Sequence, residues 1–198
     1  MGNTIVFKAA EQTPITAMFF AQLCNEAGIP PGVINMINGD GVIGAELAAH
    51  KGVDKVAFTG STAVGQSIRK STAGQGKKLT LELGGKSAFI VFEDADLDAA
   101  VEGLVDSIWF NQGEVCCAGS RLLVQAEVAK ELHLKIKRRI KQLRLGKPLD
   151  KSTDLGSLVS KTQFNRVSEM VQEGLNHGGE IYQACDIDEK GNYYPPTL

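Results

Sequence analysis

The sequence lacks an excess of charge of either sign, which argues against a protein that binds its partners through bulk electrostatics. Its 21 basic and 23 acidic side chains leave a formal net charge of −2 over 198 residues. Domains that bind nucleic acid or anionic membranes usually carry a clear excess of Lys and Arg. We therefore expect neither nucleic acid nor a membrane among the partners of this chain.

Long apolar runs, a secretory leader and a disulfide framework are also missing. No apolar run approaches the roughly 20 residues that span a bilayer. The N-terminal residues MGNTIVFKAAEQ do not contain the basic and apolar blocks of a secretory signal. The four cysteines are Cys24, Cys116, Cys117 and Cys185, and their spacing is not that of a small disulfide-stapled domain. These features predict a reducing compartment, either the cytoplasm or an organelle matrix.

The sequence does contain a regular alternation of short apolar runs and helical patterns, joined by glycine turns. Strands are predicted over residues 4–7, 33–37, 55–58, 79–83, 88–92 and 121–125. Helices are predicted over about 13–28, 43–50, 62–71, 97–110, 128–143 and 162–176. This alternation predicts parallel β-α-β units and a doubly wound, Rossmann-like α/β sheet. Ligands of such sheets bind at the carboxyl ends of the strands, where most of these glycine turns fall.

Three local expectations can be tested directly. Residues 4–7 are expected to form a short buried strand, because they are β-branched and aromatic. Thr13 is expected to cap the first helix, with Pro14 in its first position. The helix over 128–143 carries an apolar stripe and an opposite face rich in Lys and Arg. A solvated face is the favoured interpretation of that basic surface over a nucleic-acid site.

The stretch FTGSTAVG, residues 58–65, predicts a strand that turns at Gly60 into a helix. The free N–H groups of a helix's first turn, together with the helix dipole, favour a phosphate. Gly60 allows a close backbone approach, Ser61 offers a hydroxyl, and Gly65 allows the helix and the strand to pack. A plain glycine turn is the alternative, because the spacing is not G-x-G-x-x-G.

The stretch LELGGKS, residues 81–87, places Glu82 in an apolar strand just before two glycines. Apolar surroundings destabilise a carboxylate's charged form, which is how proteins prepare a general base. A glutamate on a solvated strand edge is the alternative interpretation.

The stretch NQGEVCCAGSR, residues 111–121, places two adjacent cysteines among small residues. A thiolate nucleophile needs an exposed position near backbone N–H groups or positive charge, and small neighbours leave room for a substrate. The alternative is that Cys116 and Cys117 are small hydrophobic residues that fill a core.

Taken together and in this order, the string KAAE (residues 8–11) and these three stretches resemble the NAD(P)-dependent aldehyde dehydrogenase superfamily. The resemblance extends over essentially the whole chain. It implies that Cys116 attacks the aldehyde carbonyl to form a thiohemiacetal, which becomes a thioester after hydride transfer to the nicotinamide. Glu82 would then activate the water that hydrolyses this thioester. The backbone N–H of Cys116 would be one donor to the oxyanion, and no metal is implied.

The resemblance also implies a cofactor surface. Lys8 and Glu11 would hold the adenosine ribose, and a carboxylate there favours NAD over NADP. Ser61 and its turn would hold the pyrophosphate, and Gly39 and Gly41 would shape the adenine side. The full set of implied cofactor residues is Lys8, Glu11, Gly39, Gly41, Phe58, Gly60, Ser61, Gly65, Leu83 and Gly84.

The sequence departs from the family pattern in several places. Ala9 replaces the usual proline after the lysine, and Ala63 stands where many members carry a glutamate. Family members are about two and a half times longer, so an internal fragment is expected. It would comprise part of the NAD-binding domain (residues 1–84) and the first part of the catalytic domain (85–198). Segments that supply the second oxyanion donor, the nicotinamide-ribose glutamate and the oligomerisation contacts of the family's homo-oligomers are not found. We therefore expect weak or no activity from the chain alone.

Other function classes remain open at this stage. The chain would be a nucleotide-binding pseudoenzyme fragment if it bound NAD without Cys116-dependent product. It would be a thiol esterase if Cys116 and Glu82 cleaved activated esters without NAD. A chain with a purely structural role in binding a partner would show neither NAD-dependent product nor ester cleavage. The sequence does not name the aldehyde, although Trp109 hints at an apolar or bulky substrate near its tunnel.

Overall fold

The computed structural model describes residues 2–185 and 191–198 of the chain. The chain divides into two compact units, the first ending at Leu83 and the second beginning at Gly84. The elements of the first unit are β1 (Ile5–Lys8), α1 (Ile15–Glu26), β2 (Ile34–Ile37), α2 (Gly41–Ala49), β3 (Lys55–Gly60), α3 (Thr62–Ser71) and β4 (Lys78–Leu83). Those of the second are β5 (Ala88–Val91), α4 (Leu97–Trp109), the 3-10 helix η1 (Phe110–Gly113), β6 (Arg121–Val124), α5 (Ala126–Ile140) and α6 (Lys161–Asn176).

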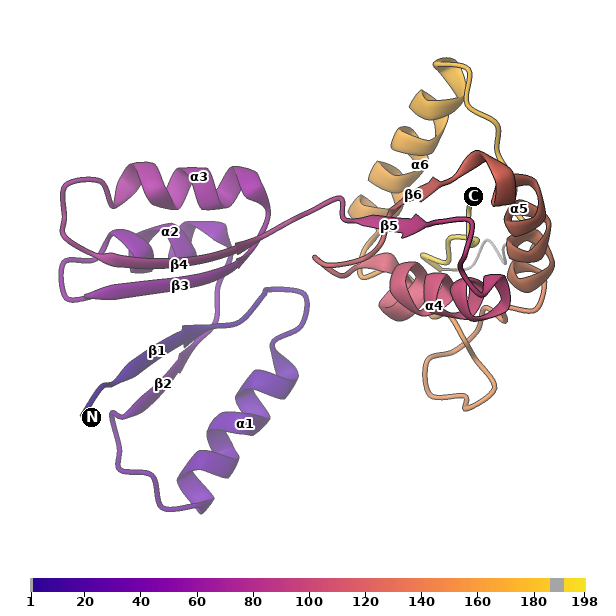
Figure 1. The fold of residues 1–198 in the computed structure, drawn as a ribbon. Helices are drawn as coiled ribbons and strands as arrows, with labels where there is room; N and C mark the ends of the chain where they lie inside the picture. The colour runs from indigo at the N-terminus through magenta and orange to yellow at the C-terminus, as the bar shows by residue number, and fades with distance from the viewer. Residues whose placement is uncertain (1, 186–190) are drawn as a thin grey trace. The chain divides into compact units, whose positions relative to one another are not determined.

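The strands pair two by two, and every pair is parallel. β1 pairs with β2, β3 with β4, and β5 with β6, each pair separated by one helix in the chain (Figure 1). This confirms the predicted β-α-β units. Among the described residues the strands form three separate two-stranded sheets, so the parallel pair is the repeating unit of this chain.

Several helices begin at a side chain that accepts hydrogen bonds from the first turn. Asp40 accepts from Val42 N and Ile43 N at the start of α2, and Asp96 does the same for α4. Such caps satisfy N–H groups that have no partner inside the helix. The prediction for α1 was wrong by one residue. Pro14 is the N-cap and no side chain caps this helix, so Thr13 does not have the expected role.

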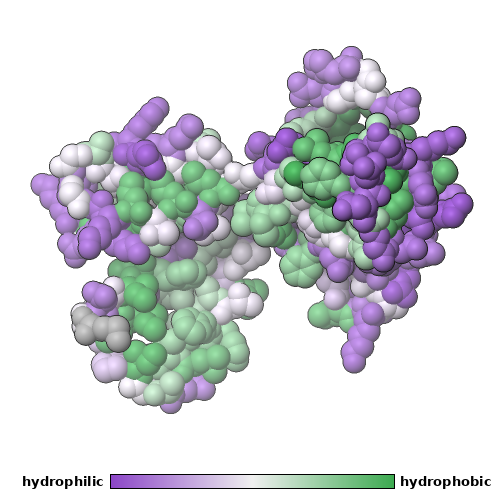
Figure 2. All heavy atoms as spheres, in the orientation of Figure 1, coloured by the Kyte–Doolittle hydropathy of each residue, from purple (hydrophilic) through white to green (hydrophobic). Residues whose placement is uncertain are grey.

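The buried strand predicted over residues 4–7 is also wrong. In β1, Ile5 is 53% exposed and Phe7 is 47% exposed. The physical reason is that β1 has a single neighbouring strand, β2, and lies at the edge of a two-stranded sheet. Helix α1 adds further exposed apolar side chains, among them Ile15, Phe19 and Phe20. Figure 2 shows hydrophobic residues gathered over this β1-α1-β2 portion.

Helix α3 packs closely on the sheet formed by β3 and β4. Gly65 in α3 is buried, and a Cβ at this position would lie 2.6 Å from a methyl carbon of Leu83. The expected close contact between helix and strand therefore exists, and a larger residue at Gly65 would require the Leu83 side chain to move. Leu83 is the last residue of β4 and pairs in register with Gly60.

The core of the second unit lies where α4 and α5 pack on the β5–β6 pair. Its buried members are Val91, Val101, Leu104, Leu132, Ile136 and Ile140. The stripe predicted for α5 is confirmed, because Leu132, Ile136 and Ile140 are its three buried residues. Beside this stripe Lys135 pairs with Asp98 and Arg139 with Glu102, so part of the basic surface is neutralised by α4.

Candidate active site

The first turn of α3 forms a potential anion site at the end of β3. Ser61 is the N-cap, and its hydroxyl oxygen accepts from Val64 N at 3.3 Å. No acidic residue occupies this turn, so nothing opposes the partial positive charge of the helix N-terminus. The Phe58 ring folds over Gly60, where a Cβ would lie 2.4 Å from the ring. The turn therefore has an N-terminal helix end without acidic residues, and the Phe58 ring leaves no room for a side chain at Gly60.

Lys8 connects the ends of the two strands in the first sheet. Its Nζ donates to the carbonyl oxygens of Ala9, at 2.7 Å, and of Gly39, at 2.8 Å. Lys8 and Gly39, two of the predicted cofactor residues, therefore lie together at the carboxyl ends of β1 and β2. Gly41 begins α2, and Glu11 is exposed in the turn that follows β1.

Of the two environments left open for Glu82, the structure of the first unit shows the solvated one. Glu82 lies in β4, whose residues alternate between exposed and half-buried, and its own side chain is on the exposed face. Its partner in register is Thr59, which is also exposed. The described residues of the first unit therefore do not give this carboxylate the apolar surroundings that the other interpretation required. Leu79, Leu81 and Leu83 occupy the other face, and a period of two explains why an apolar-looking strand still exposes its glutamate.

Cys116 and Cys117 lie in a turn between η1 and β6, and both are exposed. A hydrogen bond from Ala118 N to Val115 O, at 3.2 Å, closes this turn around the two thiols. The two cysteines are therefore not core residues. Of the two predicted alternatives, an accessible thiol and a core cysteine, the structure agrees with the accessible thiol.

The turn that carries Cys116 lies close to the backbone at Gly85. A Cβ at Gly85 would come within 2.9 Å of the Cys116 carbonyl oxygen. The second glycine of the LGGK stretch therefore permits a backbone contact with the thiol turn, whereas Gly84 has open space around its Cβ position.

The backbone just before the thiol turn is strained. Asn111 has φ 49° and Gln112 has φ 58°, and the following Gly113 has φ 77°. The left-handed conformation costs an L-residue about 1–2 kcal/mol. Such positions persist only where surrounding contacts hold them, and they cluster at functional sites.

Two residues that sequence reasoning missed hold this strained segment. The Gln112 Oε1 accepts from Gly156 N at 2.9 Å, and the Glu114 carboxylate accepts from Val159 N at 3.2 Å. No local pattern could reveal these contacts, because the partners are 44 and 45 residues apart. Partial burial raises the pKa of Glu114, and the hydrogen bond from Val159 opposes that shift.

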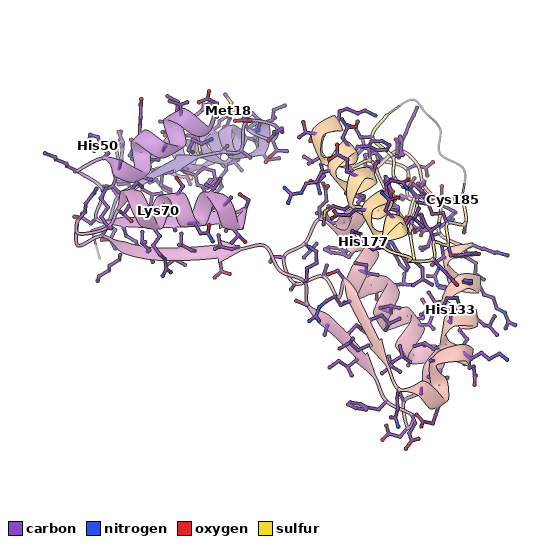
Figure 3. The ribbon with its side chains drawn as sticks, turned by 90° about the horizontal axis from the view of Figure 1, so that it is seen from above. Met18, His50, Lys70, His133, His177 and Cys185 are labelled. Carbon is purple, nitrogen blue, oxygen red and sulfur yellow. The ribbon has the colours of Figure 1, made fainter. Side chains whose placement is uncertain are left out.

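Trp109 packs against both hydrophobic clusters of the second unit. Its half-buried position is explained by this packing, and the substrate-tunnel hypothesis gains no support from it. The histidines His50, His133 and His177 come from separate places in the chain (Figure 3). Within residues 2–185 and 191–198, no group of three His, Cys, Asp or Glu side chains is arranged to hold a metal ion. The same residues include no helix that is long and apolar enough to cross a membrane.

The parallel β-α-β units, the helix α3 that begins at Ser61 directly after a strand, and the exposed thiol define an α/β protein with a candidate nucleophile. The aldehyde dehydrogenase family model matches residues 1–198. The chain belongs to the aldehyde dehydrogenase family. An aldehyde dehydrogenase from Alternaria alternata is 48% identical over 200 residues, which cover 100% of this chain and 40% of that protein.

Solved structures agree with this assignment. An NAD+ complex of a Bacillus cereus aldehyde dehydrogenase has a TM-score of 0.94 at 41% identity, covering 98% of this chain and 40% of that one. An NADP-dependent enzyme from E. coli has a TM-score of 0.93 at 38% identity, covering 98% of this chain and 41% of the other. The predicted aldehyde dehydrogenase fold is thereby confirmed. The chain spans about two fifths of the length of the relatives it matches.

Replacement of Gly85 by alanine tests the contact with the thiol turn. The added Cβ would meet the Cys116 carbonyl oxygen, so we expect Gly85→Ala to lower the free energy of unfolding by about 1–3 kcal/mol. The measurement is urea unfolding followed by circular dichroism. Gly174→Ala in α6 is the matched control, because its Cβ meets nothing within 4 Å. Equal stabilities of the two variants would contradict the contact.

The raised pKa of Glu114 predicts a pH-dependent effect of Glu114→Gln. Between the unfolded and folded pKa values the native state binds more protons, so this carboxyl's contribution to stability declines as pH rises through that window. The amide carries no charge and keeps an acceptor oxygen for Val159 N. We expect the melting temperature of the variant, relative to the original chain, to rise as the pH increases from the ordinary glutamate pKa of about 4.

The control for this titration is Glu180→Gln, which changes an exposed carboxylate in the same unit. This variant makes the same change of charge at a carboxylate that is exposed, so its curve shows the effect of the substitution without partial burial. Parallel curves for both variants would show that the Glu114 carboxyl carries no burial penalty.

Proposed function

We propose that this chain carries the thiol nucleophile, the general base and part of the NAD surface of an enzyme that oxidises an aldehyde to a carboxylic acid. The observation that carries the proposal is the exposure of Cys116 in a turn held against Gly85, next to a strained and anchored segment. Family membership supports the reaction class. In this arrangement a thiol is accessible to substrate while its backbone is fixed, as nucleophilic catalysis requires.

The chemistry begins at the Cys116 sulfur. Its thiolate forms a bond to the aldehyde carbon, and the carbonyl oxygen becomes the oxyanion of a thiohemiacetal. The Cys116 backbone N–H is the proposed donor to this oxygen. Bound NAD supplies the hydride acceptor that converts the thiohemiacetal carbon to a thioester. Glu82 then accepts a proton from water, whose oxygen displaces the thiolate, and the carboxylic acid leaves.

The exposure of Glu82 is compatible with this role. A general base for hydrolysis must reach water, and the solvated face of β4 gives it that access. Glu82 ends the first unit together with Leu83, and the GGK segment that follows begins the second. The proposal assigns residues 1–84 to the cofactor domain and residues 85–198 to the thiol domain.

The residues of the first unit fit an NAD molecule. The capped turn of Gly60 and Ser61 offers N–H groups to the pyrophosphate, with Phe58, Gly65 and Leu83 packed behind it. Lys8 lies at the ends of two strands, where the ribose is proposed to bind.

The choice between NAD and NADP is assigned to Glu11. Its carboxylate is exposed beside this surface, where it would accept from ribose hydroxyls and repel a 2′-phosphate. NAD is therefore the proposed cofactor. Gly39, Gly41 and Gly84 complete the proposed surface.

The proposed partner is a small aldehyde; the family forms homo-oligomers, but the segments that make those contacts are not found in this sequence. The proposed location is the cytoplasm or an organelle matrix, where thiols stay reduced. A cofactor-independent thiol esterase is the second candidate, because the exposed Cys116 is accessible to an activated ester.

A single-turnover experiment tests the proposed function. The chain at high concentration is mixed with NAD and a panel of aldehydes, and NADH fluorescence is followed. Because the activity of the chain alone is expected to be weak, we expect NADH to form slowly and in proportion to the amount of chain. Cys116→Ala should give at least a hundredfold less, because no other group forms the thioester. Cys117→Ala is the matched control and should keep the signal.

Each remaining outcome identifies an alternative. Ester cleavage that depends on Cys116 but is indifferent to NAD would identify the thiol esterase. NAD binding without NADH from any aldehyde would identify a nucleotide-binding fragment.

A further inference from the structure

The thiol turn is anchored on the side that precedes Cys116. Gln112 Oε1 accepts from Gly156 N at 2.9 Å, and the Glu114 carboxylate accepts from Val159 N at 3.2 and 3.4 Å. Both side chains are half-buried, and Gly156 is fully buried. The two acceptors flank Gly113, the last of the three left-handed residues. They therefore hold the strained segment at two points.

The partner segment, residues 155–159, is itself held by the body of the second unit. Leu155 N donates to Arg144 O at 3.0 Å, and Leu158 N donates to Asn192 O at 2.9 Å. The side chains of Leu155 and Leu158 are buried. The N–H groups of Leu155 and Leu158 thus bond residues 155–159 to the rest of the second unit. The N–H groups of Gly156 and Val159 bond the same residues to the segment that precedes Cys116.

The thiol turn is also anchored on the side that follows Cys117. Gly119 N donates to the backbone oxygen of Ser107 at 3.2 Å and to its hydroxyl at 3.0 Å. A Cβ at Gly119 would lie 2.4 Å from that hydroxyl, so the turn is pressed against α4. Only residues 115–118 separate the anchors at Glu114 and Gly119.

We propose that Gln112 and Glu114 are positioning residues that fix Cys116 for attack by holding the strained N-Q-G segment to residues 156–159. The inference rests on the proposed function, in which Cys116 is the nucleophile. A small displacement of a reacting atom can cost a large factor in rate, so a fixed turn matters to the chemistry more than to overall stability. The two residues act on Cys116 only through the backbone between them.

Replacement of each acceptor by a side chain of similar shape tests this role. Gln112→Met and Glu114→Met keep the length of the side chain but remove the acceptor oxygen. Glu114→Gln keeps an acceptor for Val159 N. The matched control is Gln125→Met, because the Gln125 Oε1 accepts from Glu93 N at 2.9 Å in the same unit, away from the thiol turn.

The readout is the ratio of the alkylation rates of Cys116 and Cys117 by iodoacetamide, measured by peptide mass spectrometry. Both thiols are exposed and adjacent, so general loosening of the protein changes their rates together. We expect the ratio to change at least threefold in Gln112→Met and Glu114→Met. We expect it to stay within twofold in Glu114→Gln and Gln125→Met.

Two results would overturn the inference. One is an unchanged ratio in both methionine variants. The other is loss of the folded state in these variants by circular dichroism, which would mean that the bonds hold the fold in general. The labelling needs neither NAD nor an aldehyde. A threefold change in the ratio therefore supports the positioning role even where NADH formation fails, and that failure counts against the proposed function alone.

Discussion

The geometry around Cys116 depends on one physical constraint, the close approach of the turn over residues 115–118 to Gly85. A Cβ at Gly85 would lie 2.9 Å from the Cys116 carbonyl oxygen, so the contact is possible only for glycine without a shift of backbone. The acceptors on Gln112 and Glu114 and the anchor at Ser107 act on the same few residues. Several independent contacts thus hold a strained segment in place and leave the thiol exposed.

In the first unit, the helices α2 and α3 begin close to the carboxyl ends of the parallel strands β2 and β3, so their first N–H groups lie at those ends. Ser61 begins α3 directly after β3, and Gly65 lets this helix lie against Leu83. Lys8 ties the ends of β1 and β2 together. These features bring most of the proposed cofactor residues to the carboxyl ends of their strands, where open α/β folds bind ligands.

Local patterns predicted most of the fold. Strand and helix bounds follow from periodicity and from the cap Asp96, and the stripe on α5 correctly indicated Leu132, Ile136 and Ile140. The errors concern what each element packs against. The wrong prediction of a buried β1, and the two environments left open for Glu82, both depend on which neighbours cover a strand, and the sequence pattern does not contain that information.

The candidate site was also predictable only where it depends on residues that are close together in the sequence. The small residues around Cys116 correctly indicated an accessible thiol. The anchors from Gln112 to Gly156 and from Glu114 to Val159 join residues that are far apart in the chain. Two consecutive left-handed non-glycine residues also contradict local preference, and the long-range hydrogen bonds of Gln112 and Glu114 help to stabilise them.

The most direct test of the central claim is to trap an acyl group on the chain. The Glu82→Gln variant, in which hydrolysis of a thioester should be slow, is treated with p-nitrophenyl acetate, digested and mapped by mass spectrometry. The account predicts an acetyl group on Cys116 that is absent when Cys116 is also replaced by serine. Acetylation of Cys117 alone, or of neither cysteine, would contradict it.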